Sequence, residues 1–451
     1  MQLQEFQVKL FDLGENHGFT DMELYYEREV VFGCKLYEGE IDSFETADVF
    51  GVNFRGIVGG KIGYAFTEIM DEESLLFLVE NAKANSQIVE DEEQEEILPA
   101  SSHYQERSFC SNQLEEVSIA DKINLLKNIE KHLYKDERVT GADYFQLSSV
   151  EAERAILNNK GLTLQEKQNY LAVLVSAIVK QDAEIKTGHH IEFTKDFSTL
   201  NPEEIARKAV EEALSQLDAQ SVESKNYPVL LRHDAAANLM ATFTPIFSAE
   251  NTQKGHSLLK DRVGQEIAVT NLQLVDDPFL EEGLFSRTFD SEGSATAPRE
   301  IIKDGKLVSF LHNHKTAKKD KVQSTGHAYR GSYKDAITVA PTNFYVVPAE
   351  KSFRDLVSSM KEGIVITSLS GLHSGANTVS GDFSVAANGH YIKNGQITNA
   401  VKQMTIAGNF YELLHNIETI GSDLKFTTSF VAPGYIGSPS LLIKELAVTV
   451  E

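Results

Sequence analysis

The chain has 451 residues, enough for two or three domains, and 41% of them are apolar, an ordinary share for a globular protein. Its 67 acidic and 42 basic residues give a formal net charge of −25 at pH 7. This charge repels nucleic-acid phosphates and anionic membrane surfaces, so we expect neither nucleic acid nor membrane as a partner.

The two cysteines, Cys34 and Cys110, are too few for a disulfide framework, which indicates a reducing compartment. The N-terminal residues mix charged and apolar side chains, so they do not resemble a signal peptide. The sequence has no run of about 18 apolar residues, the length that a membrane-spanning helix needs. We therefore expect a cytoplasmic protein.

The first half of the chain alternates between helix and strand signals. Apolar residues at helical spacing predict a first helix around Phe6 and Leu10. Further strands, helices and a strand meander follow, predicted over residues 17–67, 71–87, 118–135, 144–193 and 201–220. The last of these helices has Asn201 as its cap and Pro202 at its first position. This mixture predicts an N-terminal mixed α/β domain over residues 1–222.

The second half, residues 223–451, is rich in Gly, Ser, Thr and Asn and carries many short strand signals. The Asp304-Gly305 and Asn394-Gly395 pairs predict hairpin turns. Helices are predicted over residues 352–363 and 409–420. These features indicate a β-rich C-terminal domain, so the fold class expected for the whole chain is α+β.

Histidines are the first candidates for chemistry, because common motifs such as His-Glu-x-x-His, Cys-x-x-Cys and Gly-x-Ser-x-Gly are absent from the sequence. His312 and His314 form a candidate metal pair, since alternate residues of a strand point to one face. A zinc site needs about three protein ligands, however, and no third ligand is evident nearby. A polar strand face is the competing interpretation.

The stretch "GLHSGANTVSGDFS", from Gly371 to Ser384, concentrates polar residues and glycines. As a catalytic loop it would offer Ser374 or Ser380 as nucleophile, with His373 as base and Asp382 to orient it. Ser, Asn, Asp and Gly also dominate turns for backbone reasons alone. A catalytic loop, a ligand- or partner-binding loop and a structural turn therefore all remain open.

Long segments of the chain closely resemble the TldD/PmbA family. They include this stretch, the following "GHYIKNGQITNAVKQMTIAGNFYELL", and the earlier "VDDPFLEEGLFSRTFDSEGSATAPREIIKDGKLVSFLHNHKTAKK" and "STGHAYRG". The resemblance implies an α+β N-terminal domain, a β-rich C-terminal domain and dimers, commonly of a TldD-type with a TldE/PmbA-type subunit. Active members of this family are cytoplasmic zinc metallopeptidases, and the family also includes the so-called modulators of DNA gyrase.

The zinc motif of TldD-type chains is His-Glu-x-x-x-His on a helix, and the matching stretch here is "NLMATFTPIFSAEN". Ala241 and Thr242 stand where His-Glu would be, and Ile246 stands where the second His would be. Pro245 further predicts a bent or broken helix. The cysteine that TldD-type sites use near the C-terminus is also missing, since no cysteine follows Cys110.

The resemblance therefore implies a TldE/PmbA-type subunit that binds no cofactor alone and has no catalytic residue of its own, with zinc expected in a TldD-type partner. Unfolded peptides are the expected substrates, added as a strand to a sheet edge. We expect four residues to line the partner interface or the cleft: His373, Ser374, Asn377 and Asp382. One alternative is a self-contained homodimeric peptidase that uses His312 and His314 or the His373 loop. The other is a binding protein that modulates DNA gyrase.

Overall fold

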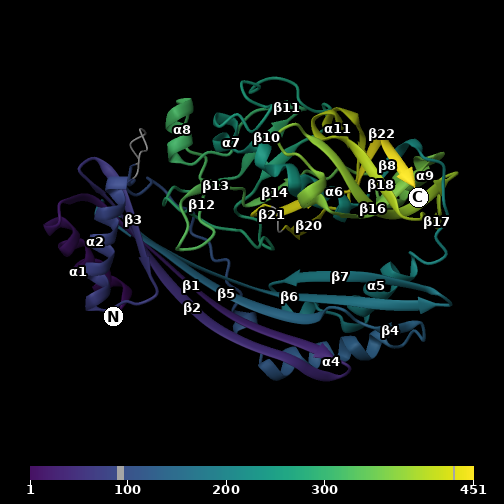
Figure 1. Ribbon diagram of the computed structural model, residues 1–451, viewed down its shortest axis with the longest axis horizontal. Helices are drawn as coiled ribbons and strands as arrows, with labels where there is room; N and C mark the ends of the chain where they lie inside the picture. The colour runs from purple at the N-terminus through teal and green to yellow at the C-terminus, as the bar shows by residue number, and fades with distance from the viewer. Residues whose placement is uncertain (89–95, 430–431, 451) are drawn as a thin grey trace.

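A computed structural model describes residues 1–88, 96–429 and 432–450 of the chain. The first half builds one long antiparallel sheet with helices packed against it, and the second half is a compact β-rich unit above that sheet (Figure 1). The predicted α+β class and the β-rich second half are confirmed.

The described part of the first half contains a seven-stranded sheet in the order β3-β2-β1-β5-β6-β4, in which β7 also pairs with β6. Its strands are β1 (Phe19–Tyr37), β2 (Glu40–Val58), β3 (Lys61–Thr67), β4 (Val139–Gly141), β5 (Phe145–Asn158), β6 (Thr163–Gln181) and β7 (Glu184–Thr194). Strands β1, β2 and β6 have 19 residues each. At about 3.4 Å per residue they are long enough to connect two separate cores.

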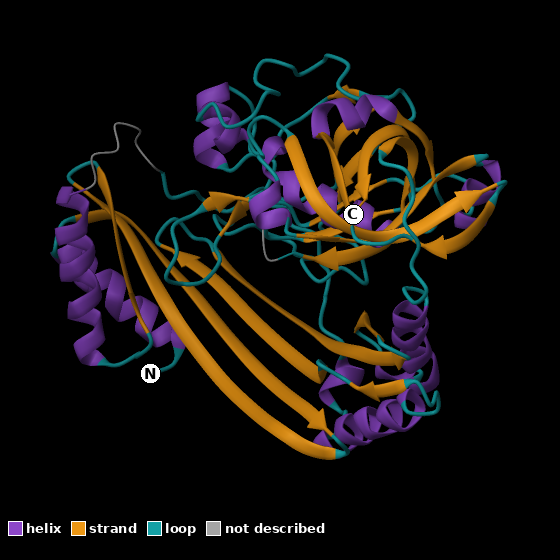
Figure 2. Cartoon of the chain, turned by 45° about the vertical axis from the view of Figure 1, so that its right-hand side comes forward, coloured by secondary structure: helices purple, strands orange, loops and turns teal. Residues whose placement is uncertain are grey.

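Helices pack against both ends of this long sheet (Figure 2). Helices α1 (Leu3–Asn16) and α2 (Glu72–Ile88) cover one end around Phe54. Helices α4 (Ile119–Leu133) and α5 (Pro202–Leu214) cover the other end, and the short α3 (Asn112–Glu115) adds Leu114 to the same core. As predicted, the Asn201 side chain caps α5 by accepting hydrogen bonds from the Glu203 and Glu204 amides.

The second half contains a barrel and a separate sheet. In the barrel, β15 pairs with both β8 and β16, which closes the ring β15-β8-β22-β18-β16. Its strands, with the attached β17 and β19, are β8 (Lys225–Leu231), β15 (Glu362–Ser370), β16 (Asp382–Lys393), β17 (Gln396–Ala400), β18 (Met404–Asn409), β19 (Ile417–Ile420) and β22 (Leu441–Val450).

The separate sheet has the order β11-β10-β9-β14-β21-β20, and a small pair β12-β13 lies beside it. These strands are β9 (Leu274–Asp276), β10 (Arg299–Lys303), β11 (Lys306–Leu307), β12 (Ala328–Tyr329), β13 (Thr338–Val339), β14 (Asn343–Val346), β20 (Lys425–Thr428) and β21 (Tyr435–Ser438). The helices of this half are α6 (His233–Phe243), α7 (Ala249–Gln253), α8 (His314–Asp320), α9 (Phe353–Ser359), α10 (Leu372–Gly375) and α11 (Phe410–Asn416). Helix α6 contacts β15 of the barrel and β20 and β21 of the sheet, so it lies between the two.

Both predicted hairpin turns are present, with positive φ at each residue of the Asp304-Gly305 and Asn394-Gly395 pairs. The two predicted helices are shorter than expected. Helix α9 ends at Ser359 and α11 at Asn416, because the residues that follow pair into β15 and β19. Strand pairing in the barrel therefore takes precedence over local helical spacing.

The two halves meet in a small core at the middle of the long sheet. It contains Tyr25 and Ile156 from the sheet and Phe289 and Tyr333 from the C-terminal half.

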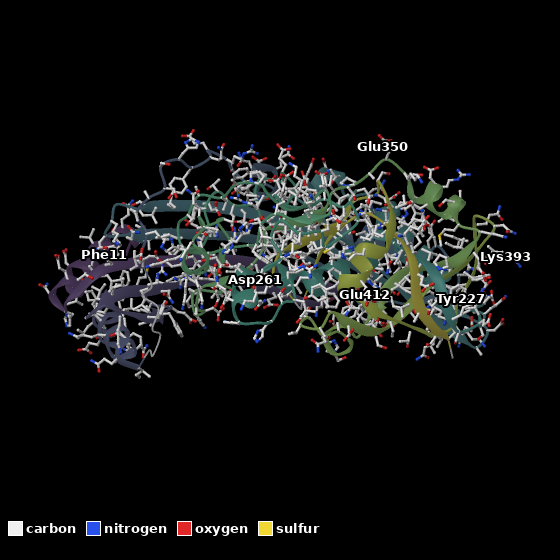
Figure 3. All side chains as sticks on the ribbon, turned by 90° about the horizontal axis from the view of Figure 1, so that it is seen from above. Phe11, Tyr227, Asp261, Glu350, Lys393 and Glu412 are labelled. Carbon is white, nitrogen blue, oxygen red and sulfur yellow. The ribbon has the colours of Figure 1, made fainter. Side chains whose placement is uncertain are left out.

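Seen from above, Phe11 and Lys393 lie near opposite ends of the molecule (Figure 3). Among the described residues, no helix combines the length and apolar character that crossing a membrane requires.

Candidate functional site

The end of helix α6 and the short 3₁₀ helix after it carry the positions where the family resemblance places zinc ligands. The second half of α6 is buried, because it lies between the barrel and the six-stranded sheet. The α-helix ends at Phe243, and a 3₁₀ helix over Thr244–Phe247 continues the chain. Pro245 accounts for the change, since its ring removes a hydrogen-bond donor and clashes with the preceding turn. The predicted break in this helix is confirmed.

The three side chains at the motif positions are part of the hydrophobic core. Ala241 and Ile246 are both 0% exposed, and Thr242 is 1% exposed. The Thr242 hydroxyl donates to the Asn238 carbonyl oxygen, 2.9 Å away, in the preceding turn of the helix. The next residue, Phe243, stacks on Phe410 with ring centroids 4.4 Å apart.

These residues do not fit a zinc ion. Alanine and isoleucine have no atom that ligates a metal, and the Thr242 hydroxyl is already hydrogen-bonded to the backbone. Within residues 1–88, 96–429 and 432–450, no three His, Cys, Asp or Glu side chains are grouped so that they could hold a metal ion. The α6 region is thus a packed core at the place where a catalytic centre would require polar ligands.

The prediction that His312 and His314 lie on one face of a strand is wrong. Asn313 caps helix α8, and its side chain and that of Thr316 form a reciprocal capping box, so the segment turns into a helix. His314 lies in the first turn of α8, and its Nε2 is 3.3 Å from Glu96 Oε2. His312 is 5% exposed, and burial lowers the pKa of its imidazole. The two imidazoles therefore have different surroundings.

His312 lies instead beside a hydrogen-bonded chain that the sequence did not reveal. Asp276 Oδ2 is 2.9 Å from His327 Nε2, and His327 Nδ1 is 2.8 Å from Thr325 Oγ1. The Thr342 amide donates to Asp276 Oδ1 at 2.7 Å, and the Thr342 hydroxyl donates to Oδ2. In the tautomer that carries its proton on Nε2, His327 donates to Asp276, and Nδ1 accepts the hydrogen bond from Thr325.

Thr325 and His312 line a groove of about 760 Å³ on the C-terminal half. The acid, imidazole and hydroxyl are linked in the order used by hydrolases with a hydroxyl nucleophile. The Thr325 oxygen also accepts a hydrogen bond from the His312 amide at 2.6 Å. Asp276 and His327 are 51 residues apart, so no local spacing in the sequence could have indicated the chain.

The Gly371–Ser384 stretch forms an exposed turn. His373 and Ser374 lie in the short helix α10, and both are exposed, as are Asn377 and Asp382. Asn377 Oδ1 accepts from the amide of Ser380 at 3.1 Å, which closes the turn. The Asn377 side chain thus stabilises the backbone of the turn, as expected for polar residues in turns.

Asp382 anchors this turn to β18. Its carboxylate accepts from Asn409 Nδ2 and Ser380 Oγ, both at 2.9 Å, and these hydrogen bonds lower the pKa of Asp382. The structure thus brings Asp382 to Ser380 and Asn409 and leaves His373 outside this network. It does not assemble the Ser-His-Asp arrangement considered for a catalytic loop. A role of the four exposed residues in partner or cleft contacts stays a prediction.

Comparisons with known proteins define the family. The chain matches three profiles described as PmbA/TldA metallopeptidase domains: domain 1 over residues 22–86, the central domain over 112–217 and the C-terminal domain over 224–450. These matches cover most of the chain. The chain therefore belongs to the PmbA/TldD metallopeptidase family.

Individual relatives agree with this assignment. The chain is 28% identical to the metalloprotease PmbA of Escherichia coli O157:H7, over 73% of this chain and 70% of the relative. It is 24% identical to a metalloprotease TldD homologue of Haemophilus influenzae, over 98% of this chain and 95% of the relative. Both PmbA and TldD names thus occur among its relatives.

Solved structures share the fold over nearly the whole chain. A candidate modulator of a DNA gyrase from Thermotoga maritima has a TM-score of 0.91 and 32% identity, covering 99% of this chain and 100% of that one. TldE from Thermococcus kodakarensis has a TM-score of 0.88 and 22% identity, covering 98% of this chain and 100% of that one. At 22% identity, the likeness to TldE shows the fold alone.

Proposed function

We propose that this chain is the zinc-free subunit of a two-component metallopeptidase that acts in proteolysis and peptide maturation. It completes or gates a substrate cleft whose zinc ion is held by a TldD-type partner. The observation that carries the proposal is the apolar core at Ala241, Thr242 and Ile246, where a TldD-type chain would place two histidines and a glutamate.

The position of the exposed turn supports a role at the partner interface. Helix α10, which contains His373 and Ser374, lies next to α6 and against β16. A partner that covers this surface would therefore approach the place where the motif is degenerate. Four polar, exposed side chains suit the rim of such an interface better than its apolar centre.

The long sheet offers a means of holding an extended peptide. Strand β3 pairs with β2 only, so it forms one edge of the sheet among the described strands. Unfolded peptides can add to such an edge through backbone hydrogen bonds, which requires little sequence specificity. We propose unfolded peptides as the substrate class on this basis.

Reconstitution tests the proposal. The chain is purified alone and together with a TldD-type protein from the same organism that carries His-Glu-x-x-x-His. We expect co-elution in size-exclusion chromatography and hydrolysis of unfolded casein by the mixture, with no hydrolysis by this chain alone. A partner variant with Gln in place of the motif Glu is the matched control, and it should bind without hydrolysing casein. Failure to co-elute would contradict the proposal.

Substitutions in the exposed turn test its role separately. The double variant His373→Ala, Ser374→Ala should weaken co-elution with the partner while leaving the thermal unfolding of the isolated chain unchanged. His103→Ala, another exposed histidine, is the control. Equal partner affinity of both variants and the wild type would show that α10 is outside the interface.

The second candidate function is a hydrolase that acts without a partner. The Asp276–His327–Thr325 chain beside the groove is the observation that favours it. In this case the isolated chain would hydrolyse peptides, and Thr325→Val would abolish that activity because valine has a similar shape but no hydroxyl. We expect the isolated chain to be inactive. The Thr325 hydroxyl would then have a structural role, as the acceptor of the hydrogen bond from the His312 amide.

A further inference from the structure

A cavity of about 170 Å³ lies where the long sheet meets the C-terminal half. Strands β1, β5 and β6 provide one wall, and the segments around residues 285–291 and 329–331 provide the other. The residues that matter for its chemistry are Tyr25, Glu27, Arg154, Glu166, Arg287 and Arg330. Three cationic side chains therefore line one small, partly enclosed space.

Arg287 is buried without hydrogen bonds at two of its nitrogen atoms. It is 5% exposed, and its Nε and Nη2 have no partner among the described residues. Burial, followed by the positive charge of Arg154, lowers the pKa of Arg287. A buried charge needs an opposite charge or hydrogen bonds to offset the loss of hydration. Arg287 thus has unused donors at the cavity wall.

Arg330 is in a similar position. It is 4% exposed, and its Nε and Nη2 also lack hydrogen-bond partners. Its Nη1 donates to the Asp335 carbonyl oxygen at a long 3.4 Å, and its guanidinium lies 5.0 Å from the centre of the Tyr25 ring. The nearest carboxylate, Glu23, is 3.6 Å away and already accepts two 3.0 Å hydrogen bonds from Arg55.

Among the described residues, none of the three carboxylates that line the cavity pairs with these two arginines, and Glu153 lies 3.5 Å from Lys167. Glu166 bonds to Arg154 and accepts from the Thr288 amide at 3.0 Å. Burial raises the pKa of Glu27 to about 7, and its Oε2 has no hydrogen-bond partner. A carboxyl group that is partly protonated at neutral pH contributes little negative charge. Arg287 and Arg330 therefore keep N–H donors that no carboxylate of the cavity uses.

We propose that this cavity binds a carboxylate group through Arg287 and Arg330. A guanidinium offers a planar fork of N–H donors that matches the two oxygens of a carboxylate. A volume of about 170 Å³ accommodates a small acid or the end of a peptide chain. The nearby Glu166 disfavours a doubly charged anion such as phosphate, because its repulsion grows with the charge of the anion.

The site goes beyond the proposed partner role and does not rest on it, since both arginines belong to this chain. The carboxylate can come from a free small acid or from the carboxyl terminus of a peptide. Both sources present the same pair of oxygens to the arginines. The position of the cavity between the two halves also means that a bound carboxylate would connect the sheet with the C-terminal loops.

Isothermal titration calorimetry of the isolated full-length chain tests the proposal, with acetate, inorganic phosphate, Gly-Gly-Gly and C-terminally amidated Gly-Gly-Gly as probes. We expect Gly-Gly-Gly with a free carboxyl group to bind and the amidated peptide not to bind. Acetate binding of similar strength would assign the site to small acids in general, and absence of acetate binding would assign it to peptide ends. Tighter binding of phosphate than of either carboxylate would overturn the assignment.

Variants connect the binding to the arginines. Arg287→Gln and Arg330→Gln should each weaken carboxylate binding at least tenfold. Arg28→Gln is the matched control, because Arg28 follows Glu27 on β1 but pairs with Asp48 at the surface. A third variant, Glu27→Gln, still tests the site if an arginine variant fails to fold. At pH 8 it should bind carboxylate more tightly than the wild type, because it lacks the negative charge of Glu27 in the cavity. Absence of binding, or binding that none of these three cavity variants changes, would overturn the proposal.

Discussion

Helix α6 and the arginine cavity are both enclosed by the fold, but they differ in what their side chains leave unsatisfied. In the second half of α6 and the 3₁₀ helix that follows it, the motif positions carry two aliphatic side chains and one hydroxyl that is hydrogen-bonded within α6. In the cavity, two buried guanidiniums retain donors without partners.

The two regions differ in how their buried groups are satisfied. A metal site is removed when its ligands are replaced by residues that pack, because the core then stabilises the fold without the ion. Unpaired buried charges oppose folding, so their presence needs a reason such as a ligand or water. This contrast supports a role in binding rather than in zinc chemistry for this chain.

The largest effect is expected from Glu23→Ala, which tests whether buried charges near the cavity depend on their partners. Glu23 and Arg55 are 0% and 1% exposed and are joined by two hydrogen bonds. Removing this carboxylate takes away the negative charge that lies beside the buried guanidiniums of Arg55 and Arg330. The unfolding free energy should therefore fall by about 3–5 kcal/mol. Urea denaturation followed by circular dichroism measures the change, since the chain contains no tryptophan. Asp48→Ala, which breaks an exposed pair with Arg28, should have a much smaller effect.

Ile246→Ala tests whether the end of α6 and the 3₁₀ helix after it form a packed core. The side chain is fully buried, so its removal should destabilise the chain by about 2–4 kcal/mol through lost contacts and a cavity. Ile69→Ala provides the control, because Ile69 is 58% exposed. Equal stabilities of the two variants in urea would contradict a core role for Ile246.

The pH dependence of stability tests the environment of Glu27. An unfolded glutamate has a pKa near 4.5, whereas burial raises that of Glu27 to about 7. Between these values the folded chain binds more protons, so the contribution of Glu27 to stability is full below pH 4.5 and is lost as the pH rises through 7. Between pH 5 and pH 8, the unfolding free energy of Glu27→Gln should therefore rise by up to about 3 kcal/mol relative to that of the wild type.

Urea denaturation at both pH values measures this difference. Glu45→Gln, an exposed glutamate on β2, serves as the control and should leave the pH dependence unchanged. A Glu27→Gln variant that follows the wild type from pH 5 to pH 8 would indicate an ionised, solvated Glu27.

The smallest effect is expected from Thr242→Val. Its hydroxyl donates one hydrogen bond within the helix, and valine fills the same space without leaving a buried donor unpaired. The change in unfolding free energy should stay below about 1 kcal/mol. A loss several times larger, or a loss of activity in the reconstituted complex, would show that this hydroxyl has a function beyond packing.

Local features of this fold could be predicted from the sequence. Asn201 and Pro202 indicated the start of α5, and the Asp304-Gly305 and Asn394-Gly395 turns formed as their positive φ angles require. Pro245 indicated the break after α6 because its effect depends only on its own turn.

Features that depend on neighbouring elements could not be predicted. His312 and His314 matched a strand pattern, but the capping box of Asn313 and Thr316 started a helix there. The cavity joins Arg154, Arg287 and Arg330 from segments that only the docking of the two halves brings together. Likewise, the Asp276–His327 contact spans 51 residues.

The most direct test of the proposed role is the zinc content of the purified chain, measured by plasma mass spectrometry after incubation with zinc and dialysis. The proposal predicts well below one zinc per chain, since Ala241, Thr242 and Ile246 offer no ligand set. Near-stoichiometric zinc that survives dialysis would contradict it.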